Sequence, residues 1–140
     1  MQTAELAASL RSAVGLLHKG LRRQVSTANL YSMTEMETIH HLFRASALPS
    51  ELAALTRITT QSMSQILVKL EGNGLIKRTP SKEDGRKVSI SLTAAGRRLV
   101  ETSKDERDAW LRARIENILN PKEQAVLARA LPLLQRLSEV

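Results

Sequence analysis

The sequence contains no cysteine, which excludes disulfide bonds, thiolate metal sites and cysteine nucleophiles within this chain. Its aromatic residues are Tyr31, Phe43 and Trp110, too few for the stacking platforms that bind single-stranded nucleic acid. No apolar run approaches the roughly 18 residues of a membrane span, and Glu5 and Arg11 interrupt the stretch that a secretory signal would need. We therefore expect one cytoplasmic domain, residues 1–140, with no membrane association.

Acidic residues are scarce in the middle of the chain, although the whole chain has a net charge of +7 at pH 7. Residues 69–98 hold three acidic residues against eight basic ones, whereas residues 99–140 are neutral overall. A concentrated positive potential attracts phosphate groups. Charge alone leaves nucleic acid, an anionic membrane and simple solubility open as explanations.

The N-terminal third has the apolar spacing of helices. Apolar residues three and four positions apart predict a long helix from Thr3 to about Val25. A turn-like stretch around residues 26–32 follows. Thr34 and Glu37 match a capping box, which predicts a second helix to about residue 45.

Two shorter helices follow in a helix-turn-helix pattern. Pro49 breaks the preceding pattern, so a short third helix is expected from Ser50. Thr59 and Thr60 offer caps for a fourth helix over residues 61–72, and only three to four residues separate the two helices.

A hairpin comes next. Asn73-Gly74 tolerates the positive φ that ends a helix, and residues 75–79 and 88–92 match short strands. The loop between them, residues 81–87, contains the turn pair Asp84-Gly85. Thr93 then caps a helix of about 25 residues, Asn120-Pro121-Lys122-Glu123 starts a sixth helix, and Pro132 predicts a kink or break in it. The fold class is mainly α with a small two- to three-stranded β wing.

The fourth helix has one polar side that fits the major groove of duplex DNA. Amides and hydroxyls near the start of such a helix can read base edges, while basic residues hold phosphates. The predicted readers are Thr60, Gln61, Ser64 and Gln65, and the predicted phosphate contacts include Ser62, Lys69 and Arg78. An ordinary solvated helix face is the alternative.

Residues 52–100 resemble the winged helix-turn-helix core of the MarR family of bacterial transcription regulators. The resemblance lies in Asp84-x-Arg86, in Leu-Glu-x-x-Gly-Leu-Ile at residues 70–76, and in Ser-Leu-Thr-x-x-Gly at residues 91–96. Two departures are Arg57, where many relatives have a small turn residue, and Ser81, where an acidic residue is common. The resemblance implies a DNA-binding lobe over about 30–98 and dimerisation helices over about 1–28 and 99–140.

The resemblance also implies an obligate homodimer, although the same apolar stripes can pack within one chain. The candidate dimerisation residues are Leu6, Leu10, Trp110, Leu111, Ile115, Leu127, Leu131 and Leu134. Many relatives respond to small aromatic or anionic effectors. The corresponding candidate pocket residues, which are more often simply core residues, are Leu17, Leu21, Tyr31, Met33, Met36 and His40.

The wing tip has its own predicted role. An arginine inserted into a narrow minor groove gains from the concentrated negative potential there, which makes Arg86 the candidate probe. Asp84 would hold the guanidinium in one orientation, and Lys82 and Lys87 would contact phosphates. The alternative is a solvated tip with an incidental ion pair of little energetic value.

No catalytic or cofactor-binding pattern is present, so we expect neither an enzyme nor a cofactor. Glu37 lies one helical turn from His40 and His41, which keeps a zinc site as a minor alternative to no metal. We predict a homodimeric, sequence-specific regulator of transcription, a repressor that binds a pseudo-palindromic duplex and responds to an effector. The alternatives are a nonspecific or architectural DNA-binding protein and a winged helix used for protein interaction.

Overall fold

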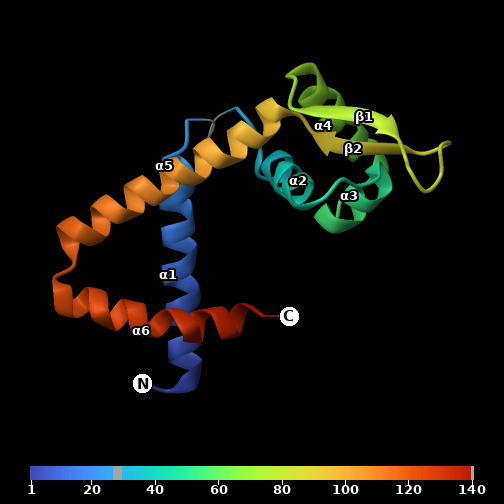
Figure 1. Ribbon diagram of the computed structural model, residues 1–140. Coiled ribbons are helices and arrows are strands. Elements are labelled where there is room, and N and C mark those ends of the chain that lie inside the picture. Colours follow the sequence, from blue (N-terminus) through green and yellow to red (C-terminus); the bar gives the residue numbers. More distant parts are fainter. Residues whose placement is uncertain (27–29, 140) are drawn as a thin grey trace. The chain divides into compact units, whose positions relative to one another are not determined.

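The computed structural model describes residues 1–26 and 30–139, so the middle of the predicted turn, residues 27–29, lies outside the described residues. The described residues form six helices and one two-stranded antiparallel sheet (Figure 1). The elements are α1 (Thr3–Arg23), α2 (Met33–Arg44), α3 (Pro49–Thr56), α4 (Thr60–Gly72), β1 (Ile76–Pro80), β2 (Val88–Leu92), α5 (Ala94–Ile118) and α6 (Pro121–Ser138). No helix in these residues is long and apolar enough to span a membrane.

The chain divides into two compact units. The winged unit, Val25–Asp105, contains α2, α3, α4, the hairpin and the first half of α5. The helical unit, Met1–Gln24 with Glu106–Val140, contains α1, α6 and the second half of α5. The division into a DNA-binding lobe over about 30–98 and dimerisation helices on either side stays a prediction.

The winged unit holds the hydrophobic core. Side chains from α2, α3, α4 and β2 meet there with almost no exposed surface, because each element presents one apolar face to the others. The largest fully buried apolar residues are Ile39, Leu42, Leu52, Met63, Leu67, Leu70 and Ile90. This core fixes the outward face of α4.

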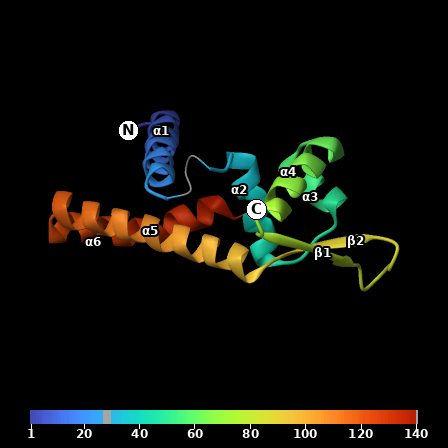
Figure 2. The ribbon, with the colours of Figure 1, turned by 90° about the horizontal axis from the view of Figure 1, so that it is seen from above.

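The hairpin pairs Ile76 with Leu92 at its base and Pro80 with Val88 at its far end. Ala47 adds a one-residue bridge on the other side of β2, since it exchanges backbone hydrogen bonds of 3.0 and 2.8 Å with Ile90. The predicted two- to three-stranded wing is therefore two strands plus this bridge. Figures 1 and 2 show the loop between β1 and β2 projecting beyond the helices of the winged unit.

The cap of α2 differs from the predicted one. The capping box is formed by Ser32 and Glu35, with hydrogen bonds of 3.1 Å to the Ser32 hydroxyl and 2.7 Å to the Glu35 carboxylate. The sequence contains two overlapping Ser/Thr-x-x-Glu patterns, and the structure uses the first. Thr34 instead lies inside the helix, where its carbonyl accepts a 2.8 Å bond from the Thr38 hydroxyl.

The turn between α3 and α4 is three residues long and contains an unusual arginine. Pro49 does not precede α3 but occupies its first turn, where a missing N–H costs nothing. Arg57 ends α3 in the left-handed conformation, with φ 58° and ψ 42°. This is the position that glycine usually fills, so an arginine here carries backbone strain.

Replacing Arg57 with glycine should raise the free energy of unfolding by about 0.5–1 kcal/mol. The left-handed conformation costs an L-residue roughly 1–2 kcal/mol, and the greater freedom of glycine in the unfolded chain offsets part of the gain. Urea unfolding followed by circular dichroism would measure the change. Arg57→Ala is the matched control, because alanine removes the charge but keeps the strain; equal stabilisation by both variants would contradict this account.

The family-like motifs around the hairpin have a packing reason. Gly74 ends α4 at φ 74°, with bonds from its own N–H to Glu71 and from the next N–H to Leu70, which is a Schellman motif. The Thr93 hydroxyl donates a 2.6 Å bond to the Gly74 carbonyl and caps α5 by accepting one from the N–H of Gly96. Gly96 lies directly against the Leu75 backbone, where a Cβ atom would clash.

The helical unit has almost no core of its own. No residue of α1 or α6 is buried, and every buried residue of α5 belongs to its first half. The Asn120 cap and Pro121 start α6 as predicted. The sequence predicts a kink or a break at Pro132; the break is wrong, because α6 continues through it to Ser138.

Candidate nucleic-acid interface

The outward face of α4 is polar, because the opposite face supplies Met63, Leu67 and Leu70 to the core. All four predicted readers, Thr60, Gln61, Ser64 and Gln65, are exposed, and they come from the first half of the helix. Thr59 caps this half by accepting a 3.0 Å bond from the N–H of Ser62. The arrangement presents several hydrogen-bonding side chains at a rigid helix start.

Val68 belongs to the same outward face, although sequence reasoning did not select it. Its side chain is 64% exposed and follows Ser64 by one helical turn. The sequence does show that Val68 is an apolar residue outside the apolar stripe of residues 63, 67 and 70, and this could have identified it. An exposed apolar side chain among amides can contact the methyl group of thymine.

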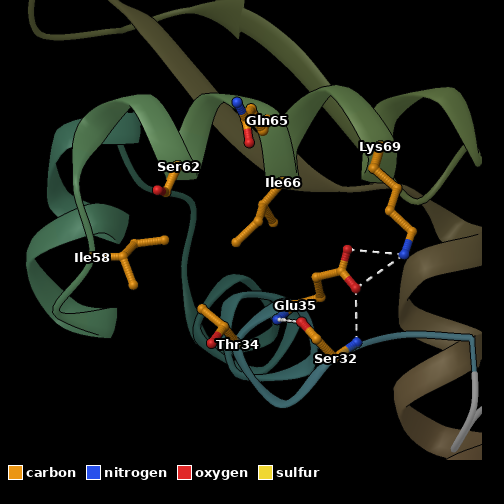
Figure 3. A pocket seen from close by; sticks show the side chains of 8 residues that line it. All are labelled: Ser32, Thr34, Glu35, Ile58, Ser62, Gln65, Ile66 and Lys69. Atoms are coloured by element: carbon orange, nitrogen blue, oxygen red, sulfur yellow. Dashed lines mark hydrogen bonds and ion pairs between the residues drawn. The ribbon is translucent and has the colours of Figure 1, made fainter.

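A cleft of about 450 Å³ lies beside the outward face of α4, between this helix and the start of α2. Figure 3 shows Ser62, Gln65, Ile66 and Lys69 of α4 on one side. The other lining residues are Ser32, Thr34, Glu35 and Ile58. Two predicted DNA contacts, Ser62 and Gln65, therefore also border this cleft.

Glu35 is the most enclosed charged group in the cleft. Burial raises the pKa of its carboxyl, but the backbone hydrogen bond from Ser32 and the nearby Lys69 ammonium outweigh burial, so the net pKa is below the ordinary value of 4.5. Glu35 is thus an anion at neutral pH and a fixed counter-charge for Lys69, whose Nζ lies 3.0 Å from its carboxylate oxygen.

The wing tip carries a preformed acid–arginine pair. Asp84 accepts bonds of 3.2 and 3.4 Å from the Arg86 guanidinium and a 3.1 Å bond from the Arg86 backbone N–H. These Arg86 hydrogen bonds, the side-chain ones first, hold the pKa of Asp84 below its ordinary value. The Arg86 side chain is nevertheless 93% exposed, so it is oriented without being covered.

Backbone bonds close the loop that presents this pair. The N–H of Ser81 donates 2.8 Å to the Lys87 carbonyl, and the N–H of Lys87 donates 2.9 Å to the Asp84 carbonyl. Ser81, noted above as a departure, also accepts a 3.3 Å bond from the Glu83 N–H. Lys82 and Lys87 are exposed on the same loop. Arg78, on β1, is paired with Glu71 at 3.2 Å and is less available.

The other predicted sites remain predictions. The effector residues divide between the units, with Leu17 and Leu21 in the helical unit and the rest in the winged unit. Among the described residues no group of three His, Asp or Glu side chains can hold a metal ion. The pair Glu37–His41, from the zinc alternative, has an Oε1–Nε2 distance of 3.7 Å.

Known proteins share this architecture. The model of the MarR family matches residues 32–87, which include the cap of α2, α4 and the wing loop. An uncharacterised HTH-type transcriptional regulator of Mycobacterium bovis is 30% identical over 132 residues, covering 94% of this chain and 91% of the relative. The chain belongs to the MarR family. It is a transcription regulator and not an enzyme, as the sequence predicted.

Solved structures of MarR-like regulators agree with this assignment. A Pseudomonas aeruginosa protein described as a candidate transcriptional regulator is 33% identical, with a TM-score of 0.86 and coverage of 99% of this chain and 98% of that one. A variant of Staphylococcus aureus MepR bound to an oligodeoxyribonucleotide has a TM-score of 0.72 at 18% identity, covering 95% and 98%. The second likeness shows the shared fold alone.

Proposed function

We propose that this MarR-family chain is a homodimeric, sequence-specific repressor that binds a pseudo-palindromic operator. One observation carries the proposal: the exposed hydrogen-bonding face of α4 occurs in the same compact unit as a projecting wing with an oriented Arg86. A helix start can read the major groove while an arginine enters a minor groove, which together define a half-site.

The homodimer is supported by the uncovered apolar surface of the helical unit. Residues of α1 and α6 that would be buried in a closed core are exposed instead, and a symmetric partner is the usual way to cover such surface. The most exposed include Leu6, Leu16, Val126, Leu131, Leu133 and Leu137.

Repression and effector control rest on resemblance. An HTH-type transcriptional repressor of Mycobacterium tuberculosis is 32% identical over 120 residues, covering 83% of this chain and 78% of the relative. Release by a small aromatic or anionic effector, through the pocket residues named above, stays a prediction from the family. A cytoplasmic location follows from the proposal, because bacterial operators lie there.

Selection of bound sequences from random duplex DNA tests the proposed function. We expect an enriched inverted repeat whose half-sites are about one helical turn or a multiple of it apart. The selected duplex should bind at least about a thousandfold more tightly than a random one. Selection with the variant Gln61→Ala/Gln65→Ala, which changes no charge, should return a different or weaker motif at unchanged salt dependence.

The alternatives give distinct outcomes. A nonspecific or architectural protein would bind duplex DNA with a steep salt dependence but enrich no motif. A winged helix used for protein interaction would enrich no motif and respond little to salt. Either result would overturn the proposed function.

A further inference from the structure

Lys69 contacts the segment that leads into α2 and the first turn of that helix, on one side of a lysine side chain that is 45% exposed. Its Nζ lies 3.1 Å from the Leu30 carbonyl oxygen, 3.0 Å from Glu35 Oε1 and 3.0 Å from Glu35 Oε2. The same Nζ lies 5.3 Å from the centroid of the Tyr31 ring, within cation–π range. Figure 3 shows the lysine reaching from α4 to the Glu35 carboxylate.

These contacts use the full donor capacity of the ammonium group. A lysine has three N–H donors, and three oxygen atoms lie at hydrogen-bond distance. The Lys69 side chain is 45% exposed, so a DNA phosphate would compete with these oxygen atoms for the ammonium group. Displacing Glu35, whose side chain is 10% exposed, would leave that carboxylate without its counter-charge. Lys69 is therefore poorly suited to the phosphate contact that the sequence predicted.

A second contact lies at Asn73, the C-cap residue of α4, one helical turn beyond Lys69. The side-chain amide of Asn73 donates a 3.0 Å bond to the Tyr31 hydroxyl. Lys69 and Asn73 are four residues apart, so both side chains lie on the same side of the end of α4, where they contact Tyr31. We call Leu30, Tyr31, Glu35, Lys69 and Asn73 the clamp.

We propose that Lys69 is a positioning residue, which through the clamp sets the orientation of the reading helix, and that it makes no phosphate contact. This inference rests on the proposed function, because what the clamp orients is the proposed reading face of α4.

A small change of the helix direction at the clamp would displace the reading residues at the other end of α4. Gln61 precedes Lys69 by eight residues, a separation of about 12 Å along a helix. A tilt of roughly 10° about the clamp would move Gln61 by about 2 Å, whereas a good hydrogen bond tolerates only a few tenths of an ångström. A loosened clamp should thus reduce base reading while leaving the nonspecific attraction of the wing intact.

The test compares Lys69→Met, Glu35→Gln and the double variant with the wild-type chain, on the selected operator and on random duplex, over a range of salt concentrations. Glutamine at position 35 keeps the capping box, because its amide oxygen can still accept the Ser32 N–H. Each single variant should lower operator affinity by roughly tenfold per half-site, or about a hundredfold for the dimer, as one misplaced base contact in each half-site does. Random-duplex affinity and the salt slope should stay unchanged, and the double variant should be no weaker than the singles.

The phosphate alternative predicts the reverse. Lys69→Met would then reduce the salt slope by about 0.9 per subunit and weaken both duplexes, and Glu35→Gln would bind as well as or better than the wild type. That result would overturn the proposal. Lys82→Met in the wing serves as the control for a true phosphate contact, and Lys69→Arg should retain operator affinity because it can still pair with Glu35.

Thermal unfolding of the free protein separates this inference from the proposed function. If the wild-type chain binds no operator, the proposed function fails. The clamp is then tested only by whether the Lys69→Met and Glu35→Gln variants change the melting temperature independently of each other. A clamp requires the effects of Lys69→Met and Glu35→Gln to be strongly non-additive. Additive effects would overturn it, whatever the DNA result.

Discussion

Replacing Leu131 with aspartate is expected to convert the proposed dimer into a monomer and to abolish operator binding at nanomolar protein. Leu131 lies on α6, a helix with no buried residue, and its side chain is 49% exposed in the single chain. If dimerisation covers it, each dimer loses the burial of the exposed half of two leucines, roughly 1.5–3 kcal/mol. Desolvation of two unpaired carboxylates adds several kcal/mol more.

A loss of this size raises the dimer dissociation constant by about four orders of magnitude or more. Sedimentation at micromolar protein should show the wild type as a dimer and the variant as a monomer with the same helical content. Ala125→Asp, which adds the same charge at another exposed position of α6, is the matched control and should remain dimeric. If Leu131→Asp also stays dimeric, the dimer surface lies elsewhere or the stripes pack within one chain.

Local patterns predicted most of the fold because caps and apolar spacing act over a few residues. The Asn120 cap, the Thr93 cap and the positive φ at Gly74 all follow from neighbours in sequence. The pattern could not decide between Ser32 and Thr34 as the cap of α2, because each has a glutamate three residues later. In the structure the chosen glutamate, Glu35, also pairs with a lysine 34 residues away, and no local rule contains that contact.

The candidate interface also has features that local patterns predict and features that depend on contacts between distant residues. Exposure of Gln61 and Ser64 could be predicted, since the apolar stripe of α4 fixes which side faces the core. The engagement of Lys69 and Arg78 could not, because their acidic partners lie on a different turn or element and the sequence shows only a cluster of positive charge. Part of the basic excess that suggested DNA binding is thus neutralised within the winged unit.

Because Lys69 and Arg78 are paired with acidic residues, we expect the wing loop to contribute more of the DNA-binding free energy. Replacing Arg86 with alanine should weaken operator binding by about 1–3 kcal/mol per wing, or roughly 2–6 kcal/mol for a dimer, while leaving the dimer intact. Asp84 already orients the guanidinium through two hydrogen bonds, so less side-chain freedom is lost on docking than for a free arginine. Titration of the selected operator at fixed salt would measure the loss.

Two comparisons test whether Arg86 acts in the minor groove. Arg129→Ala removes the same charge from an exposed position of α6 and should change operator affinity little. Replacing A·T pairs by G·C where the wings reach should weaken the wild-type chain and leave Arg86→Ala nearly unaffected, because the narrow A·T groove is what attracts the arginine. Equal losses for both proteins would place Arg86 on the phosphate backbone instead. Asp84→Ala should lower operator affinity less than Arg86→Ala does, since it leaves the Arg86 guanidinium in place and removes only the groups that orient it.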